Sequence, residues 1–361
     1  MKEIKLLRWA VICAAISCGC TINISPPGPA GDLPQASGLP STGVQSPAGW
    51  KSLKLNGRLI YTSGKVDTSQ GTVFLALSVQ ALELATGSIT TIFSAPQGAW
   101  IDAATVSPDE RQLVISYRSP SDAGQSGLYV MPLDGSQKPQ LLFVPPSDND
   151  RYYQPGWSPD GKYVYFSHTN YQGSTTYEVM RMAYPDGKPE NLADQAYWPS
   201  VSKDSARLTY VSIDPSSGAN GLYLANADGT QSHQVPVSGP WVREIIDAPV
   251  FTTDNQSVLF SAPTSQQSSK PHWLDQVLGL GVAYAHSSVP SEWWSVPLAG
   301  GKPVELTHVR LYGLFASFSP DGEYIASFST DGIFVMKPDG TGLTKVVDYV
   351  GGILGTVDWI H

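Results

Sequence analysis

Apolar and polar residues alternate in short segments along most of the chain after about residue 50. The segments form repeated units with a short strand, a Ser/Thr-x-Asp turn, and a second strand rich in aromatic and β-branched residues. That composition suits a pleated, half-buried surface. The units lie at 104–119, 155–169, 199–213, 249–263 and 316–330. The pattern therefore predicts five related strand-turn-strand units.

A third and a fourth strand are predicted after each unit. The third strand runs into an Asp-Gly or Gly-Gly turn, where positive φ values suit Gly and Asp. These segments are 127–136, 177–188, 221–230, 293–302 and 332–341. The turn aspartates Asp109, Asp160, Asp204, Asp254 and Asp321 are separated by 51, 44, 50 and 67 residues. Four strands at this period are typical of β-propeller blades.

The two ends of the repeat region complement each other. Residues 55–64, 73–87 and 89–93 match the second, third and fourth strands of a blade whose first strand is missing. The C-terminal "GTVDWI" (355–360) matches a first strand. We therefore predict an all-β, six-bladed β-propeller of four-stranded antiparallel blades, closed by the C-terminal strand pairing into blade one, because closure removes exposed sheet edges. The predicted blades are 50–99 with 353–361, then about 100–149, 150–195, 196–240, 241–307 and 308–352.

The Ser-Pro-Asp-Gly turns at 158–161 and 319–322, with the Asp-Gly hairpins that follow them, resemble the repeats of TolB-type and related WD-like propellers. The resemblance covers nearly everything after residue 50. It implies the propeller fold, an architecture that hosts binding modules, lyases and peptidase accessory domains. TolB proteins carry an α/β domain ahead of the propeller, and here residues 21–49 occupy that place, which argues against a Tol-Pal role.

The N-terminus has the layout of a secretory signal, with three basic residues followed by an apolar run from about Trp9 to Ile16 and small residues around cysteine. "AISC" and "SCGC" both resemble a bacterial lipobox, so Cys18 or Cys20 is predicted to be lipidated. Cleavage to a soluble protein is the alternative. The predicted domains are a lipoprotein-type signal peptide (1–20), a disordered Pro/Gly/Ser linker (21–49) and the propeller (50–361) with an insert at 264–292.

Charge and cysteine content exclude several classes of function. Without Lys2, Glu3, Lys5 and Arg8 of the signal, the formal charge changes from −9 to −11, which argues against nucleic acid as a partner. All three cysteines lie in the first 20 residues, so the body offers no disulfide and no thiolate. We predict no cofactor.

The sequence predicts no catalytic residue and no metal ligand. It lacks the Gly-x-Ser-x-Gly elbow of a serine hydrolase and a second, α/β domain. The six histidines, His168 among them, are scattered at unrelated motif positions, and we interpret them as surface residues. The Asp-x-Asp spacing in 147–151 lacks the further ligands of a calcium loop and is interpreted as a solvated loop. The five turn aspartates are interpreted as caps of backbone N–H groups.

A set of aromatic residues and arginines precedes the first strands. The crossover between blades runs toward the axial funnel, so these residues are expected to ring one opening, with packing between blades as the alternative. Trp, Tyr and Arg dominate binding hot spots. The predicted binding residues are Trp100, Arg151, Tyr152, Tyr153, Tyr197, Trp198, Trp241, Arg243, Arg310 and Tyr312.

These observations predict a non-enzymatic, extracytoplasmic binding protein or scaffold, anchored to the bacterial cell membrane by lipid and facing the periplasm or the cell surface. The predicted partner is an envelope protein or peptide held at the funnel face, and the chain is expected to be a monomer. The alternative is a carbohydrate-binding or polysaccharide-lyase propeller.

Overall fold

The Ser/Thr-x-Asp turns each join two antiparallel strands in a computed structural model of the chain. The structure describes residues 49–67, 73–118, 127–214, 219–238, 246–263, 290–348 and 355–361. The predicted signal peptide (1–20), residues 21–48 of the predicted linker (21–49) and residues 264–289 of the predicted insert lie outside the described residues. Within the described ranges the one helical element is a 3-10 turn, η1 (Trp50–Leu53).

Side-chain hydrogen bonds account for the recurrence of the turn sequence. At 158–163, Ser158 Oγ donates to Asp160 Oδ1 (2.7 Å), and the same oxygen accepts the backbone N–H of Lys162 (3.1 Å). Ser158 Oγ also accepts the N–H of Tyr163 (2.9 Å). The hydrogen bond from the hydroxyl lowers the pKa of the aspartate. The same bonds recur at Asp109, Asp204, Asp254 and Asp321, which confirms the turn-capping role predicted for these residues.

The strands assemble into antiparallel sheets of four. Four separate sheets each contain consecutive strands. The first is β8 (Asp150–Trp157), β9 (Tyr163–Asn170), β10 (Thr176–Ala183) and β11 (Glu190–Asp194). The second is β12 (Ala196–Val201), β13 (Arg207–Ile213), β14 (Asn220–Asn226) and β15 (His233–Gln234). The third is β16 (Asp247–Phe251), β17 (Ser257–Ala262), β18 (Glu292–Pro297) and β19 (Val304–Glu305). The fourth is β20 (Phe315–Phe318), β21 (Ile325–Ser329), β22 (Gly332–Met336) and β23 (Thr344–Asp348).

The remaining strands form one eight-stranded sheet. It contains β1 (Arg58–Asp67), β2 (Val73–Glu83), β3 (Ile89–Ser94), β4 (Trp100–Val106), β5 (Gln112–Arg118), β6 (Gly127–Pro132), β7 (Gln140–Phe143) and β24 (Val357–Ile360). A single residue pair, Ala76 with Ile101, joins β2 to β4.

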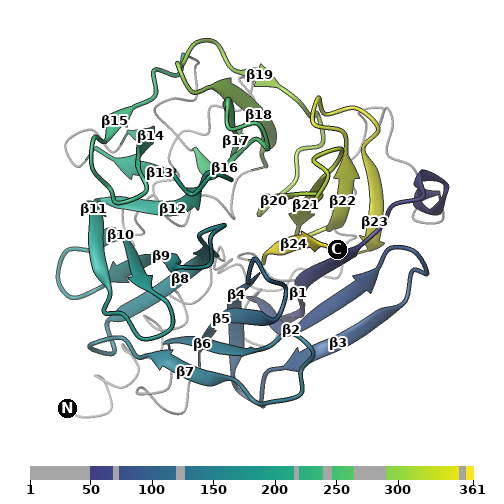
Figure 1. The fold of residues 1–361 in the computed structure, drawn as a ribbon, viewed down its shortest axis with the longest axis horizontal. Helices are drawn as coiled ribbons and strands as arrows, with labels where there is room; N and C mark the ends of the chain where they lie inside the picture. The colour runs from purple at the N-terminus through teal and green to yellow at the C-terminus, as the bar shows by residue number, and fades with distance from the viewer. Residues whose placement is uncertain are drawn as a thin grey trace, which may run out of the picture.

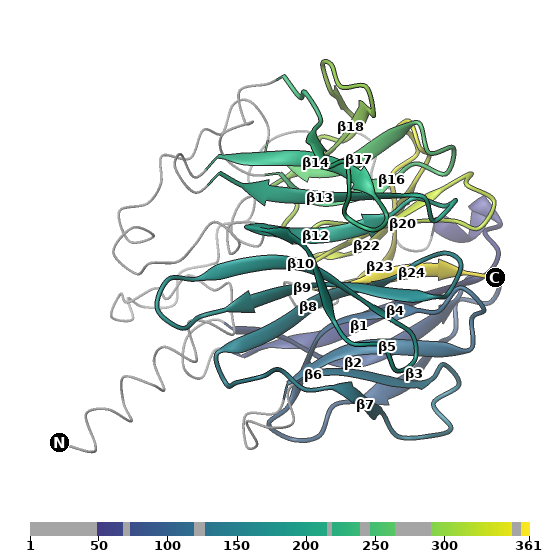
Figure 2. The same ribbon diagram turned by 60° about the vertical axis from the view of Figure 1, so that its left-hand side comes forward.

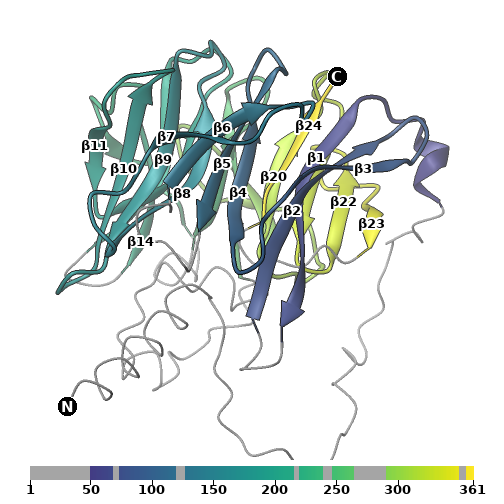
Figure 3. The ribbon, with the colours of Figure 1, turned by 90° about the horizontal axis from the view of Figure 1, so that it is seen from below.

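The sheets stand around a central axis, which makes the molecule an all-β propeller (Figure 1). Two further views show the strands running between two faces (Figures 2 and 3). We call the face where β8, β12 and β20 begin the crossover face. The opposite face carries the Ser/Thr-x-Asp turns and is called the turn face.

Apolar side chains fill the space between neighbouring sheets. Val114 and Leu128, from β5 and β6, form one cluster with Val164, Phe166 and Met182 of the next sheet. Each of these side chains is removed from water when the sheets pack together. Full burial of one such apolar side chain stabilises the fold by roughly 1.5–3 kcal/mol.

Neighbouring turns are also linked on the turn face. The residue after the turn aspartate has a positive φ in every repeat, and three of these residues are not glycine. In those three the side chain accepts a backbone N–H from the preceding turn or from the C-terminal residue. The pairs are Ser205 with Asp160 N (3.0 Å), Asn255 with Lys203 N (2.9 Å) and Glu110 with His361 N (3.0 Å).

The C-terminal strand β24 pairs with β1 over four residues, from Arg58 with Ile360 to Tyr61 with Val357. Gly57, at φ +85°, lies against the Ile360 carbonyl so closely that a Cβ there would be 2.1 Å from its oxygen. Hydrogen bonds that involve side chains also join β24 to β4 and to β20 of a separate sheet. Asp358 Oδ2 accepts the N–H of Val106 on β4 (2.7 Å), and Trp359 N donates to Ser317 Oγ on β20 (3.1 Å).

Candidate functional site

The predicted binding residues within the described ranges lie at the starts of inner strands or just before them. Trp100 is the first residue of β4, Arg151 to Tyr153 begin β8, and Tyr197 and Trp198 begin β12. Arg310 and Tyr312 lie ahead of β20. Trp241, Arg243, Cys18 and Cys20 lie outside the described residues.

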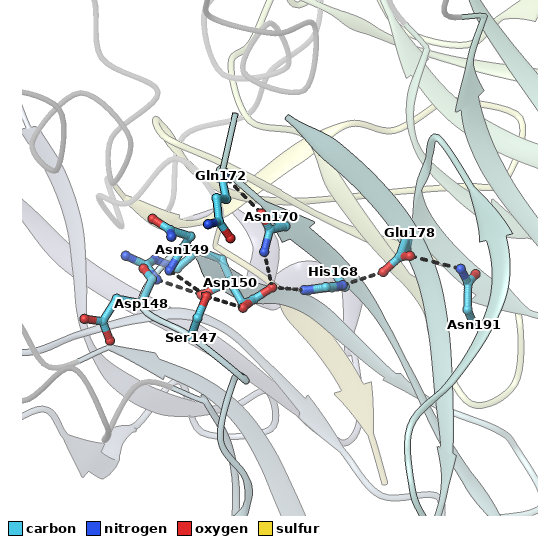
Figure 4. A network of polar contacts seen from close by, with 10 residues as sticks. Ser147, Asp148, Asn149, Asp150, His168, Asn170, Gln172, Glu178 and Asn191 are labelled. Atoms are coloured by element: carbon cyan, nitrogen blue, oxygen red, sulfur yellow. Dashed lines mark hydrogen bonds and ion pairs between the residues drawn. The ribbon is translucent and has the colours of Figure 1, made fainter. Parts of the chain in front are cut away.

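A polar network fixes the start of β8 on the crossover face (Figure 4). His168 of β9 lies between two carboxylates, with Nε2 2.7 Å from Asp150 Oδ1 and Nδ1 2.6 Å from Glu178 Oε2. Asp150 also accepts hydrogen bonds from Asn170 Nδ2 (2.7 Å) and from Ser147 Oγ (2.6 Å). The network therefore ties β8, β9 and β10 together at one end of the sheet.

The geometry of His168 determines what this network can do. Both ring nitrogens face carboxylate oxygens, so either both carry protons or one carboxyl group does. In neither state does the imidazole offer a lone pair to a metal ion. The His168 side chain is 12% exposed, so the interpretation of His168 as a surface histidine was wrong. Asp150 is also buried, which the solvated-loop interpretation of 147–151 did not anticipate.

A buried ion pair lies beside this network, one sheet earlier. Arg118 of β5 pairs with Asp102 of β4, and its guanidinium lies over the Tyr153 ring at 4.8 Å. Burial raises the pKa of Asp102, and the positive charge of Arg118 opposes that rise. The Tyr153 hydroxyl is 2.7 Å from the hydroxyl of Tyr171. The Arg118 guanidinium therefore links the eight-stranded sheet to the sheet β8 to β11.

Trp198 of β12 contacts two other inner strands, β16 and β20. It has a positive φ of 60°, and its indole Nε1 donates to Asp247 Oδ1 on the next inner strand (3.1 Å). Its ring meets Phe315 of β20 edge to face, with centroids 4.9 Å apart. Because β16 stands between β12 and β20 in the ring, Trp198 reaches past one sheet to the next (Figure 1). Only 4% of its surface is exposed, so Trp198 packs between inner strands instead of facing a ligand.

Glu292 shapes the loop that carries Arg310 and Tyr312. Its side chain is buried in β18, and its carboxylate accepts the N–H of Val309 (2.7 Å), the N–H of Arg310 (2.6 Å) and the hydroxyl of Thr307 (2.8 Å). Burial raises the pKa of Glu292, and these donors oppose the rise. The carboxylate holds Arg310 at a φ of 53°. Nothing in the sequence signals this role, since Glu292 is 18 residues from Arg310.

The predicted binding residues divide into two groups. Tyr152, Tyr153, Tyr197 and Trp198 are buried in the packing between sheets. Arg151 and Trp100 are half-buried, Arg310 is exposed, and Tyr312 is 39% exposed. A ligand on the crossover face would therefore meet Arg151, Arg310 and Tyr312, while the buried rings support the surface beneath it.

The fold defines an all-β propeller protein. Solved structures similar to it include a putative TolB from Agrobacterium tumefaciens, with 17% identity, a TM-score of 0.57, and coverage of 82% of this chain and 91% of that one. TolB from Acinetobacter baumannii is similar at 14% identity and a TM-score of 0.58, covering 83% of this chain and 66% of that one. The nidogen/laminin complex contains a chain similar at 9% identity and a TM-score of 0.54, with 84% and 98% covered.

The sequence comparisons found no match. No family model matches the chain, and no curated protein matches it. The likeness to solved structures identifies the fold alone, a TolB-like propeller.

Within the described part of the chain, no group of three or more His, Cys, Asp or Glu side chains is arranged to hold a metal ion. The described residues also contain no helix long and apolar enough to cross a bilayer.

Proposed function

We propose that the propeller has six blades and that β24 closes the ring. The eight-stranded sheet would then be two blades, β24-β1-β2-β3 and β4-β5-β6-β7, joined by the single Ala76 to Ile101 pair between β2 and β4. The pairing of β24 with β1 and the side-chain bonds from β24 to β4 and β20 support this proposal.

We infer that the crossover face binds an extracytoplasmic protein or peptide and that the chain acts as a binding protein or scaffold rather than as an enzyme. The observation that carries this proposal is the Glu292 carboxylate, which holds an exposed arginine and a partly exposed tyrosine on one rigid loop. Because the loop backbone is already fixed by the hydrogen bonds to Glu292, binding would not pay for ordering the loop, and Arg and Tyr are frequent hot-spot residues. The fold shared with TolB-type propellers is compatible with this role.

The place of action is part of the same proposal. Lipidation at Cys18 or Cys20 and the linker at 21–49 would tether the propeller to the bacterial cell membrane as a monomer. A flexible linker of this length spans on the order of 30 Å. The tether would then keep the binding face close to the membrane, where it would contact partners within the envelope rather than in bulk solution.

Site-specific photocrosslinking in the cells that make the protein tests the binding face. We would place a benzophenone amino acid at Tyr312 or at Arg151 on the crossover face. Both positions are expected to give the same discrete adduct, because one partner covers both. Arg310→Ala is expected to weaken the Tyr312 adduct about tenfold, the effect of losing one hot-spot contact.

The matched control is the same amino acid at Lys203, an exposed residue on the turn face. No adduct is expected there. Equal adducts at all three positions, or none at either crossover-face position, would refute the proposed binding face. The melting temperature of each variant should match that of the unchanged protein.

A further inference from the structure

A cavity of about 310 Å³ lies on the turn face, between the sheet β8 to β11 and the sheet β12 to β15. It is separate from the crossover face discussed above. Its walls include the Ser/Thr-x-Asp turns of both sheets and the tip of the hairpin between β14 and β15. Pockets for small ligands run from roughly 300 Å³ upward, so this cavity is at the size of a small molecule.

Arg181 supplies hydrogen-bond donors to the cavity. Its side chain is 14% exposed, and its guanidinium lies over the Tyr163 ring at 4.5 Å. Nε pairs with Glu190, and Nη1 donates to the carbonyl of Ala227 (2.9 Å). The hydroxyl of Tyr165 lies beside it and donates to the same carbonyl (2.7 Å). A guanidinium has five N–H donors. Glu190, the Ala227 carbonyl and the Tyr165 hydroxyl take at most three of them, so at least two remain for a ligand.

Two aspartates supply acceptors to the same cavity. Asp228, at the hairpin tip, uses Oδ1 for the N–H (3.0 Å) and the hydroxyl (2.5 Å) of Thr230. Asp160 uses Oδ1 within its turn and turns Oδ2 toward the exposed ammonium of Lys162 (3.1 Å). Within the described residues Asp228 Oδ2 makes no hydrogen bond. The cavity therefore offers a carboxylate oxygen and guanidinium N–H groups to one ligand.

This combination selects a ligand class by charge. A small anion drawn to Arg181 is repelled by Asp160 and Asp228, and a small cation drawn to the aspartates is repelled by Arg181. An uncharged ligand with neighbouring hydroxyl groups avoids both repulsions. One hydroxyl donates to the carboxylate and the next accepts from the guanidinium. The partly exposed ring of Tyr163 adds surface for the C–H face of such a ligand, and the buried Tyr165 supports the cavity wall behind it. We propose that this cavity binds a neutral saccharide of one or two rings.

Titration of the purified propeller by saturation-transfer NMR tests the proposal. The probes are glucose, N-acetylglucosamine, cellobiose and, as a charged comparison, acetate. At least one sugar is expected to bind saturably and acetate is not. Asp228→Asn should weaken sugar binding about tenfold, because it removes the charge from the open oxygen while the turn keeps its acceptor.

The matched control is Asp339→Asn. Asp339 sits at an equivalent hairpin tip after β22, where its Oδ1 accepts the N–H (3.0 Å) and the hydroxyl (2.7 Å) of Thr341. This variant reproduces any general effect on a turn and should leave sugar binding unchanged. Arg181→Lys keeps the charge but loses the planar set of donors, and it should weaken binding as well.

Several outcomes would overturn the proposal. They are no saturable binding of any of the three sugars, equal losses in Asp228→Asn and Asp339→Asn, and binding of acetate in preference to the sugars. Each variant is compared at a temperature where circular dichroism shows the native state, so that loss of folding is not mistaken for loss of binding.

Discussion

Glu292 illustrates how one buried side chain can determine the form of an exposed loop. Its two oxygens take three hydrogen bonds from residues 307, 309 and 310, and those bonds set the backbone that displays Arg310. A buried carboxylate is costly unless it is fully satisfied. The three donors, in turn, lose a good acceptor if the side chain changes. The carboxylate and the loop therefore stabilise each other.

Glu292→Gln is expected to destabilise the protein by about 1–3 kcal/mol. The amide nitrogen cannot accept a hydrogen bond, so at least one of the three donors would face it without a partner. Urea unfolding measures the loss. Glu305→Gln, in the neighbouring strand and with its side chain 26% exposed, is the control and should change stability by less than about 0.5 kcal/mol. Equal stability of the Glu292 variant and the unchanged protein would contradict the role assigned to this carboxylate.

Single residues were predictable where their partners are local. The turn aspartates bind N–H groups two residues away, so Asp160 could be interpreted correctly from "SPDGK" alone. His168 could not, because its partners Asp150 and Glu178 belong to different strands. Trp198 was predicted to precede an inner strand, and it lies inside β12 near its beginning. Its contact with Phe315, 117 positions later, depends on how the sheets are arranged around the axis.

At the scale of one element, β24 combines pairing with β1 and side-chain contacts to β4 and to β20. Asp358 makes the contact to β4 through Val106, and burial raises the pKa of Asp358 to about 6. An aspartate has an unfolded pKa of about 3.9. The folded chain therefore holds this proton more tightly, and the stabilisation is complete below pH 4 and is lost as the pH rises through 6.

Asp358→Asn is expected to remove this pH dependence. The asparagine carbonyl can still accept the Val106 N–H, and the side chain carries no charge at any pH. The unchanged protein should lose on the order of 2 kcal/mol relative to the variant between pH 4 and pH 7. Urea unfolding at several pH values measures the difference. Parallel stability profiles for the two proteins would mean that Asp358 does not titrate as described.

Strand positions were largely predictable, and their roles in the sheets less so. The alternating pattern located the inner and second strands, and the Asp-Gly turns located the third. The outer strands β15 and β19 have only two residues each, so periodicity gives almost no signal there. The residue pair that joins β2 to β4 has no sequence signature, because this contact is a backbone pairing between Ala76 and Ile101.

At the scale of the whole molecule, the proposed closure makes the stability of the ring depend on its last seven residues. Deleting residues 355–361 removes the partner of β1 and the bonds to Val106 and Ser317. We expect the melting temperature to fall by more than about 10 °C, since every kcal/mol corresponds to roughly 2–4 °C in a domain of 150–250 residues. Differential scanning calorimetry measures the shift.

Removing His361 alone is the control for that deletion. His361 contacts Glu110 from an exposed position, where a single contact contributes little to stability. A small shift for the single deletion and a large one for the seven-residue deletion are expected. An unchanged melting temperature in both would mean that the C-terminal strand is an appendage rather than part of a closed ring.

The pairing of β24 with β1 also has a mechanical consequence. If the chain is tethered ahead of residue 50, any pull on the propeller first meets Trp50, whose ring is buried, and then acts along β1. That strand is bonded to β2 on one side and to β24 on the other. Force along the strand must shear two ladders at once instead of peeling one open, so forced unfolding, which depends on the unfolding rate, should be slow. The first strand that a tether would pull is held by the last strand of the chain.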